Sequence, residues 1–419
     1  MTGSAPADLS PAPHDPYVSL RHREFRWYIV SLFAMTLGTQ LQAVVVGWQV
    51  YSITHDPLSL GLIGLAEALP FIAVALPAGY LADRLNRRTV AVVGLAVLAM
   101  CAIALLALSL EGVLTRVGVA PIYVVIFASG IARSLLQPAR QALSSELVPR
   151  DHLPNAIAWR SSSWQIAAVV GPAVGGLLYG FSGPVAAYSV DVALMICALL
   201  GMLTMRYQPG VWTPSDRSIG TNLLVGLRFV FGQPVILAAL SLDLFSVFLG
   251  GAEALLPVFA SEVLHIGPQG LGVLRAAPAA GAVTMGLYLA HRRPFERAGR
   301  SMLLAVAVFA VCIIGFGLST SFWLSLGLLA VSGMADSVSV VIRSTLVQML
   351  TPTDMLGRAS AVNSVFVGSS NELGAFESGV AARLLGAVPA VVLGGVASLA
   401  VVGLTARLVP ALRKLERIA

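Results

Sequence analysis

Long apolar segments follow one another along almost the whole chain, and they constrain the fold more than any other feature. A bilayer core is spanned by about 20 apolar residues in a helix. Segments of that kind cover residues 27–51, 57–82, 89–110, 119–142, 154–180, 185–205, 230–260, 268–290, 301–320, 323–346, 359–385 and 388–409. Backbone groups in lipid must be hydrogen-bonded within the chain. We therefore expect an all-α integral membrane fold with twelve transmembrane helices.

The composition argues against soluble classes of protein. Only 11% of the residues are charged, whereas a soluble domain carries about 25%. The net charge of +6 does not indicate nucleic-acid binding, because the arginines lie between apolar segments and form no basic face. Cys101, Cys197 and Cys312 lie inside apolar segments, so we expect neither a disulfide nor a metal site, and no cofactor.

Positive charge is distributed unequally between alternate gaps. With the N-terminus inside, the cytoplasmic gaps and tails hold Arg21, Arg23, Arg26, Arg84, Arg87, Arg88, Arg150, Arg206, Arg217, Arg228, Arg292, Arg293, Arg297, Arg300, Arg358, Arg407, Arg413, Lys414 and Arg417. The opposite gaps hold Arg116. By the positive-inside rule, both termini are predicted to be cytoplasmic.

The two halves of the chain resemble each other. At an offset of 203 residues, Gly130, Arg133, Arg140, Pro149, Asp151, Gly171 and Gly176 fall on Gly333, Asp336, Arg343, Pro352, Asp354, Gly374 and Gly379. We expect two six-helix bundles related by an axis along the membrane normal, with a cavity between them. The predicted parts are a disordered tail (1–22), an N-terminal bundle (23–206), a cytoplasmic linker (207–226), a C-terminal bundle (227–410) and a tail (411–419).

Ionisable groups inside the apolar segments are candidates for a substrate or proton pathway, because such groups usually face a cavity. They are Glu67, Arg133, Arg140, Asp191, Asp243, Glu253, Arg275, Asp336, Arg343, Glu372 and Glu377. Asp243, Asp336 and Glu377 are the predicted proton carriers. Arg140 and Arg343 lie near the cytoplasmic ends of their segments, where snorkelling to lipid headgroups is an alternative.

Segment 359–385 carries polar residues every seven positions. Asn363, Ser370 and Glu377 form one series, and their neighbours Ser364, Asn371 and Ser378 form another. Seven residues are nearly two helical turns, so both series lie on one face. The stripe is predicted to line a water-filled path; the alternative is hydrogen-bonded contact between helices.

The repeat pairs polar residues from the two halves. Gln40 corresponds to Asp243, and Arg133 corresponds to Asp336. If both members line the cavity, Arg133 and Asp336 can form a charge pair across it. Alternatively, each residue is satisfied within its own bundle.

One charged turn carries a family resemblance. The run Gly79-Tyr-Leu-Ala-Asp83-Arg84-Leu-Asn-Arg87-Arg88 resembles the loop between helices 2 and 3 of the major facilitator superfamily of secondary transporters. The resemblance implies that Asp83 caps segment 359–385 and that the arginines hold the cytoplasmic face shut.

A glycine-rich run in segment 154–180 is similar to the antiporter signature of exporting facilitators. It reads Gly171-Pro172-Ala-Val-Gly175-Gly176, but Ala158 and Ala167 stand where the full signature has glycines. Close helix packing is the alternative interpretation.

Further motifs resemble the enterobactin-exporter-like branch of bacterial efflux facilitators. They include Pro138-Ala-Arg140-Gln141, Leu153-Pro154-Asn155-Ala156 and the run from Asn363 to Gly379. The resemblance implies a monomeric, multi-pass carrier of the bacterial inner membrane. It would export a siderophore or drug-like small molecule by alternating access and proton antiport.

Three alternatives remain from the sequence. A proton-coupled importer would use the same fold. Gly180-Phe-Ser182-Gly183 matches the motif of intramembrane serine proteases, although no histidine is expected near it. A channel would have a fixed pore, which a duplicated bundle with charged midplane groups suits less well.

Overall fold

The computed structural model describes residues 15–110, 113–207, 225, 227–292, 295–352, 355–413 and 415, and the side chains of residues 75–84, 115, 356–359, 361, 364, 365 and 369 lie outside this description. All regular structure in the described part is helical. Within the described residues, ten helices are long and apolar enough to cross a membrane, and the span that contains residues 153–204 is counted as one of them. The predicted all-α integral membrane fold is confirmed.

The N-terminal half begins with a short 3₁₀ helix and continues with long helices. Its elements are η1 (Val18–Arg21), α1 (Arg23–Thr54), α2 (Pro57–Arg84), α3 (Arg87–Leu108), α4 (Val113–Val117), α5 (Ala120–Glu146), η2 (Arg150–His152) and α6 (Leu153–Thr204). Asn86 separates α2 from α3, because its side chain accepts hydrogen bonds from the backbone N–H groups of Arg88 and Thr89, at 2.9 and 3.3 Å. That cap satisfies donors that the helix itself cannot pair.

The C-terminal half has a similar series of helices. Its elements are α8 (Pro234–Leu249), η3 (Ala252–Leu255), α9 (Leu256–Val258), η4 (Phe259–Val263), α10 (Gly267–Ala290), α11 (Ala298–Leu318), α12 (Phe322–Leu350), α13 (Leu356–Leu385), α14 (Ala387–Leu408) and α15 (Pro410–Arg413). The predicted segment 230–260 is interrupted, because α8 ends at Leu249 and Gly250-Gly251 precede η3. Glycine weakens a helix there by about 1 kcal/mol per residue.

Two equivalent glycines reverse the chain in the two halves. Gly183 lies inside α6 with φ of 78°, and Gly386 lies between α13 and α14 with φ of 91°. These positive angles favour glycine, and the two residues are 203 positions apart. Gly183 divides α6 into a first part (153–182) and a second part (184–204). The serine protease motif therefore coincides with a helix reversal, and Ser182 forms no hydrogen bond to a described histidine.

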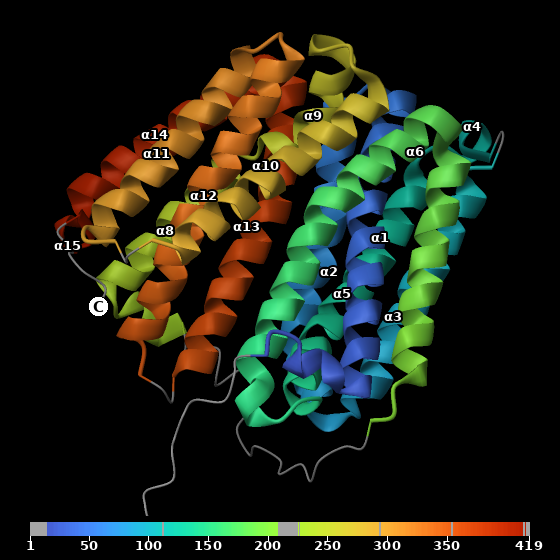
Figure 1. Cartoon of the computed structure of the whole chain (residues 1–419). Helices are drawn as coiled ribbons and strands as arrows, with labels where there is room; N and C mark the ends of the chain where they lie inside the picture. Colours follow the sequence, from blue (N-terminus) through green and yellow to red (C-terminus); the bar gives the residue numbers. More distant parts are fainter. Residues whose placement is uncertain are drawn as a thin grey trace, which may run out of the picture.

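The helices form two groups that lean together at one end (Figure 1). We call the end at which α1 begins the tail side and the opposite end the far side. At offset 203, the first residue of α6, Leu153, falls on the first residue of α13, Leu356. This agreement supports the duplicated arrangement. Division of α6 at Gly183 raises the number of candidate crossings among the described residues from ten to eleven. Twelve crossings stay a prediction, because α13 is not among the helices that qualify.

Two glycine contacts hold the halves together on the far side. A Cβ on Gly176 of α6 would lie 2.4 Å from the Pro268 oxygen and 2.7 Å from the Gly272 Cα of α10. A Cβ on Gly379 of α13 would lie 2.6 Å from the Gly61 Cα of α2. Gly176 and Gly379 are equivalent in the repeat. The backbones therefore touch at two symmetry-related places where no other residue fits.

The glycine-rich run of α6 has a second packing role. A Cβ on Gly171 would lie 2.6 Å from the Gln40 Cβ, and one on Gly175 would lie 2.9 Å from the Leu41 oxygen. These two glycines pack against α1 within the N-terminal half, and Pro172 contributes its oxygen to the Gly272 contact. Both sides of the run serve close packing, as the alternative interpretation predicted.

A buried apolar cluster joins the halves at the same end. Val44, Tyr51 and Leu60 of the N-terminal half pack with Leu255, Phe259, Leu271, Phe316 and other residues of the C-terminal half. Each half also has a core of its own, one centred on Phe25, Tyr28 and Met195 and the other on Met302 and Ile342. The far side is thus the place where the two halves share a core.

Gly176→Ala is expected to open the far side, because a single added Cβ overlaps the backbone of α10. Spin labels at Phe181 and Leu318, both exposed on the far side, would report a longer distance, with Cys197 replaced by serine. Gly286→Ala in α10 is the matched control, since nothing lies within 4 Å of its Cβ position. It should leave the distance unchanged and gain up to about 1 kcal/mol in helix propensity. Equal distances in both variants would contradict the role of Gly176.

Candidate functional site

A cluster of four charged residues spans the two halves. Arg133 of α5 forms an ion pair with Glu67 of α2. Glu372 of α13 lies within hydrogen-bonding reach of Glu67 and within electrostatic reach of Arg133 and of Arg275 of α10. Glu67 and Arg133 belong to the N-terminal half, and Glu372 and Arg275 belong to the C-terminal half. The cluster is therefore neutral when all four groups are charged.

Small residues one turn before the charged ones bring the helices together. A Cβ on Gly64 would lie 2.6 Å from the Ala375 Cβ and 2.8 Å from the backbone carbonyl oxygen of Glu372. A Cβ on Gly130 would lie 2.7 Å from the Pro70 Cγ. Gly64 and Gly130 precede Glu67 and Arg133 by three residues, which places each glycine on the same face as its charge. This close approach brings Glu67 of α2 near the charged residues of both α5 and α13.

The chemistry of the cluster follows from its two carboxyl groups. Carboxylates only accept hydrogen bonds, so Glu67 and Glu372 can bond to each other only when one carries a proton. Arg133 is 45% exposed at its side chain and Glu67 22%, so the pair is not sealed inside the protein. The site can hold a proton, bind an anion at an arginine, or exchange one for the other.

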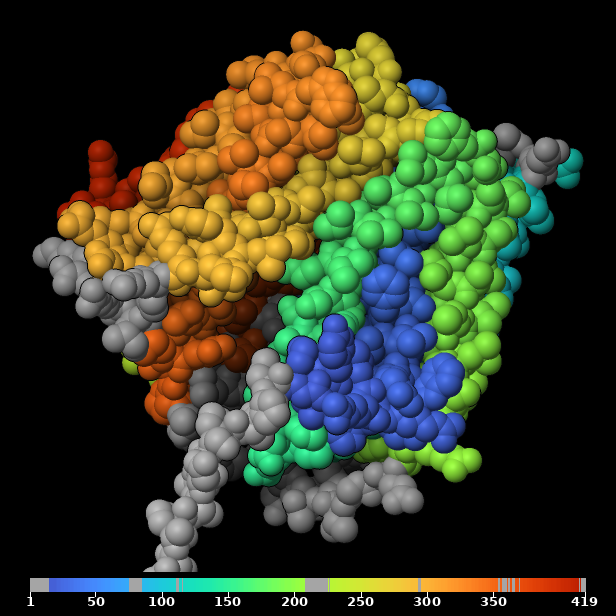
Figure 2. All heavy atoms as spheres, viewed as in Figure 1, coloured from blue at the N-terminus to red at the C-terminus, as the bar shows by residue number. Residues whose placement is uncertain are grey.

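The surface is hollowed between the first part of α6 and the C-terminal half, on the tail side (Figure 2). Arg140 follows Arg133 on α5 by seven residues and therefore lies on the same face, nearer the tail side. Among the described residues no carboxylate pairs with Arg140; its Nη1 lies 3.6 Å from the Met35 Sδ. Unpaired positive charge therefore extends from the cluster toward the tail side.

The predicted pair between Arg133 and Asp336 is absent from this structure. Arg133 bonds to Glu67 of its own half, in line with the alternative considered from the sequence. Asp336 is half-buried in α12, and its charged neighbour is Glu253 of η3. Glu372 is the acidic group of the C-terminal half that acts electrostatically on Arg133, and the sequence analysis did not pair these two residues.

Asp243 is paired inside the C-terminal half and does not line an open path. Its carboxylate forms an ion pair with Arg343 of α12, and the two side chains are only 8% and 5% exposed. Arg343 therefore does not snorkel to headgroups, because the Asp243 carboxylate balances its charge inside the bundle. The repeat places Gln40 and Arg140 at the equivalent positions, and Gln40 is half-buried against Gly171. The N-terminal half lacks the acid of this pair.

The polar stripe of α13 divides between different surroundings. Ser370 is buried and its Oγ donates to the Val367 oxygen, 2.9 Å away on the same helix. Asn371 is exposed, and Asn363 is half-buried with its Oδ1 unpaired. Ser364 has no described side chain. The polar stripe therefore does not form one continuous surface that is exposed to water.

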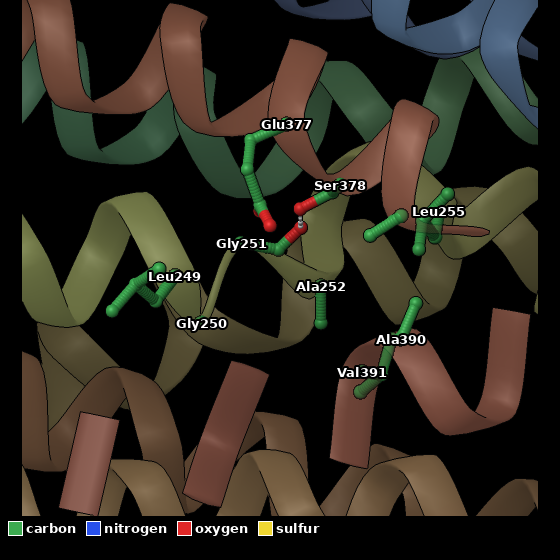
Figure 3. A pocket seen from close by; sticks show the side chains of 10 residues that line it. Leu249, Gly250, Gly251, Ala252, Leu255, Glu377, Ser378, Ala390 and Val391 are labelled. Carbon is green, nitrogen blue, oxygen red and sulfur yellow. Dashed lines mark hydrogen bonds between the residues drawn. The ribbon is translucent and has the colours of Figure 1, made fainter. Parts of the chain in front are cut away.

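Glu377 and Ser378 face the interruption after α8 (Figure 3). The Ser378 Oγ donates to the Gly251 oxygen at 3.0 Å. Glu377 lines a cavity of about 10 Å³ beside Gly250, Gly251 and Ala252, room for about one water. Ser378 thus connects α13 to the segment between α8 and η3. Glu377 lies five residues after Glu372 on α13 and is not part of the charge cluster.

The arginines of the charged turn bind within the N-terminal half. Arg87 forms an ion pair with Glu146 of α5. Arg88 donates to the Met202 and Leu203 oxygens, at 3.3 and 2.6 Å, where the free carbonyls of a helix end attract cations. The side chains of Gly79, Asp83 and Arg84 lie outside the described residues, and so does the predicted cap on α13.

Two polar contacts across the far side had no signal in the sequence. The Tyr51 hydroxyl donates to Glu262 of η4. Asp56 forms an ion pair with Arg383 of α13 at 3.1 Å, and it also accepts from the Leu58 N–H at 3.0 Å at the start of α2. Sequence reasoning missed them because Glu262 and Arg383 lie near the ends of apolar segments. They reinforce the closed far side.

Comparisons with known proteins agree with this geometry. A family model described as transmembrane secretion effector, a major facilitator family, matches residues 14–418. The enterobactin exporter EntS of Escherichia coli O1:K1 is 29% identical over 346 residues, 81% of each chain; that of Shigella boydii serotype 18 is 28% identical over the same shares.

Solved structures show the same fold. A bacterial homologue of the human lysosomal transporter Spinster, in an inward-facing and unoccupied conformation, has a TM-score of 0.71 at 15% identity, covering 96% of this chain and 99% of that one. A POT family transporter in complex with a thioalcohol-conjugated peptide has a TM-score of 0.72 at 12% identity, covering 94% and 97%.

Arg343→Met is expected to lower the melting temperature strongly in detergent, because it leaves the Asp243 carboxylate buried without a partner. Removing one member of a buried pair costs about 3–5 kcal/mol. Combining it with Asp243→Asn should recover part of the loss. Arg383→Met is the control, since it breaks a more exposed pair worth about 0–1 kcal/mol. Additive losses in the double variant would contradict the coupling.

Proposed function

Since the chain belongs to the transmembrane secretion effector family of the major facilitator superfamily, and is a multi-pass membrane transporter, we propose that it exports a small molecule by proton antiport. The cargo we propose is a siderophore, the class to which the substrate named for the EntS relatives belongs. The membrane is the bacterial inner membrane, with both termini cytoplasmic, so that the tail side faces the cytoplasm. The charge cluster of Glu67, Arg133, Arg275 and Glu372 is the observation that carries this proposal.

The conformation supports loading from the cytoplasm. Glycine contacts and the shared apolar cluster close the far side, and the hollow lies on the tail side (Figure 2). A carrier in this state receives cargo from the side on which its termini lie. Export requires the far-side contacts to part, which moves the halves against each other around the cluster.

The charge cluster supports exchange of protons for cargo. When cargo leaves on the far side, a proton entering the Glu67–Glu372 pair restores the carboxyl–carboxyl hydrogen bond. When the carrier returns to the tail side, an arriving anion competes with the carboxylates for Arg133. The proton must leave to the cytoplasm before the anion binds Arg133, because a negative charge beside Glu67 and Glu372 disfavours ionisation of their carboxyl groups.

The arginines favour an anionic or polyphenolic cargo. Arg133 and Arg140 lie on one face of α5, and Arg140 has no carboxylate partner among the described residues. Guanidinium groups bind oxyanions through paired N–H donors. A siderophore with ionisable oxygen ligands suits such a surface, whereas a cationic drug does not.

The test is flux through reconstituted protein. Proteoliposomes with an imposed pH difference should move a catecholate siderophore against its gradient, and Glu372→Gln should abolish the response to the pH difference while leaving downhill exchange. Asp151→Asn, which changes an exposed carboxylate of η2, is the control and should behave as the parent. Transport that ignores both the pH difference and the membrane voltage would refute proton antiport.

The same assay tests the cargo. Arg140→Gln should raise the KM for an anionic siderophore by roughly tenfold, the loss of one charge-assisted hydrogen bond of about 1.5 kcal/mol. A neutral sugar and a cationic dye, supplied at equal concentration, should not be transported. Transport of the dye with no transport of the siderophore would refute the cargo assignment and leave the carrier mechanism intact.

A further inference from the structure

A second cavity lies on the outer surface of the N-terminal half, away from the charge cluster. Its volume is about 340 Å³, and it lies between η1, α1 and both parts of α6. Its walls are Leu20, Ile29, Val30, Phe33, Ala34, Trp159, Ser163, Leu194 and Cys197. In Figure 2 the N-terminal residues of this region are seen on the surface between the two parts of α6. We call this cavity the α1–α6 groove.

The walls of the groove are almost wholly apolar. Ser163 is buried, and the Trp159 Nε1 already donates to the Pro16 oxygen at 3.0 Å. Val30 is 42% exposed, so the groove is open at the surface. Because it lies within membrane-spanning helices, that opening faces lipid, and a hydrocarbon chain is the matching occupant.

Hydrogen bonds fix the tail end of the groove. The Ser19 N–H donates to the Asn155 Oδ1 at 3.1 Å, and the Ser19 Oγ donates to the His152 oxygen at 3.1 Å. The Asn155 Nδ2 donates to the Pro16 oxygen at 2.8 Å. These bonds attach η1 to the start of α6 and hold Leu20 in the wall.

Two arginines continue the α1 wall toward the tail side. Arg26 precedes Ile29 and Val30 by three and four residues, so it lies on the same helical face. Arg23 lies one further turn toward the tail side. Both are exposed, and neither forms an ion pair with a described carboxylate. The charge at this end of the groove is available to a ligand.

We propose that the α1–α6 groove is a binding site for an anionic phospholipid of the cytoplasmic leaflet. One acyl chain occupies the groove, and the phosphate lies on Arg23 and Arg26. The order of the parts agrees with the membrane, since the arginines lie at the headgroup level and the apolar walls lie deeper. Basic pockets between transmembrane helices on the cytoplasmic side recognise acidic headgroups in this way.

The groove contains its own reporter of occupancy. Cys197 is the exposed thiol among the three cysteines, and Cys101 and Cys312 are buried. In delipidated protein, a small membrane-permeant maleimide should label Cys197 readily. Phosphatidylglycerol should slow this labelling, whereas phosphatidylcholine with the same chains should slow it much less. Peptide mass spectrometry measures the rate at each thiol.

Variants separate the headgroup from the chain. Arg23→Gln and Arg26→Gln should each weaken protection by phosphatidylglycerol about fivefold, the equivalent of about 1 kcal/mol for one basic residue at the surface. Arg300→Gln with Arg407→Gln is the matched control, because both arginines are exposed on the tail side of the other half. Val30→Trp fills the groove and should slow labelling without lipid.

Three outcomes would overturn the proposal. Equal protection by phosphatidylcholine would remove the preference for an anion, and protection by glycerol phosphate alone would remove the role of the chain. Labelling that is slow before lipid is added, and slower at higher protein concentration, would assign the groove to a second copy of the protein. None of these outcomes bears on export, which the flux assay tests separately.

Discussion

The contact of backbone with backbone at Gly176–Gly272 and Gly379–Gly61 is the constraint on which the rest of the arrangement depends. At these two places the halves meet without side chains between them, so helices α6 and α10, and α2 and α13, cross as closely as helices can. Everything on the far side follows from that approach, including the shared apolar cluster and the bonds of Tyr51 and Asp56. A hollow on the tail side is the geometric consequence of two rigid bundles that meet at one end.

The charge cluster lies along the same helices that make the glycine contacts. Gly61, Gly64 and Glu67 follow one another on α2, and Glu372 and Gly379 lie seven residues apart on α13. Separation of the glycines must therefore change the distance between the two carboxyl groups. In the antiport that we propose, the rigidity of these two helices links proton binding at the carboxyl groups to closure of the far side.

The helices, the repeat and the types of polar residue could be predicted from the sequence, because hydropathy and a fixed offset can be read along the chain. The ion-pair partner of each charged residue could not be predicted. Arg133 had Asp336 as its repeat equivalent, yet it bonds to Glu67 on a neighbouring helix, and Asp243 bonds to Arg343. Such choices depend on helix rotation and on glycines such as Gly64 and Gly130, whose effect is visible only when the opposing backbone is in place.

The two halves differ in charged residues at equivalent positions. The C-terminal half keeps a buried acid and base together in Asp243 and Arg343, whereas the N-terminal half has Gln40 and Arg140 at those positions. Without an acid at that position, Arg140 has no carboxylate partner among the described residues. If the two halves had the same residues at these positions, both would have an unpaired arginine or neither would. In the export that we propose, this difference gives the N-terminal half the positive charge for an anionic cargo, while Glu67 and Glu372 lie at the boundary between the halves.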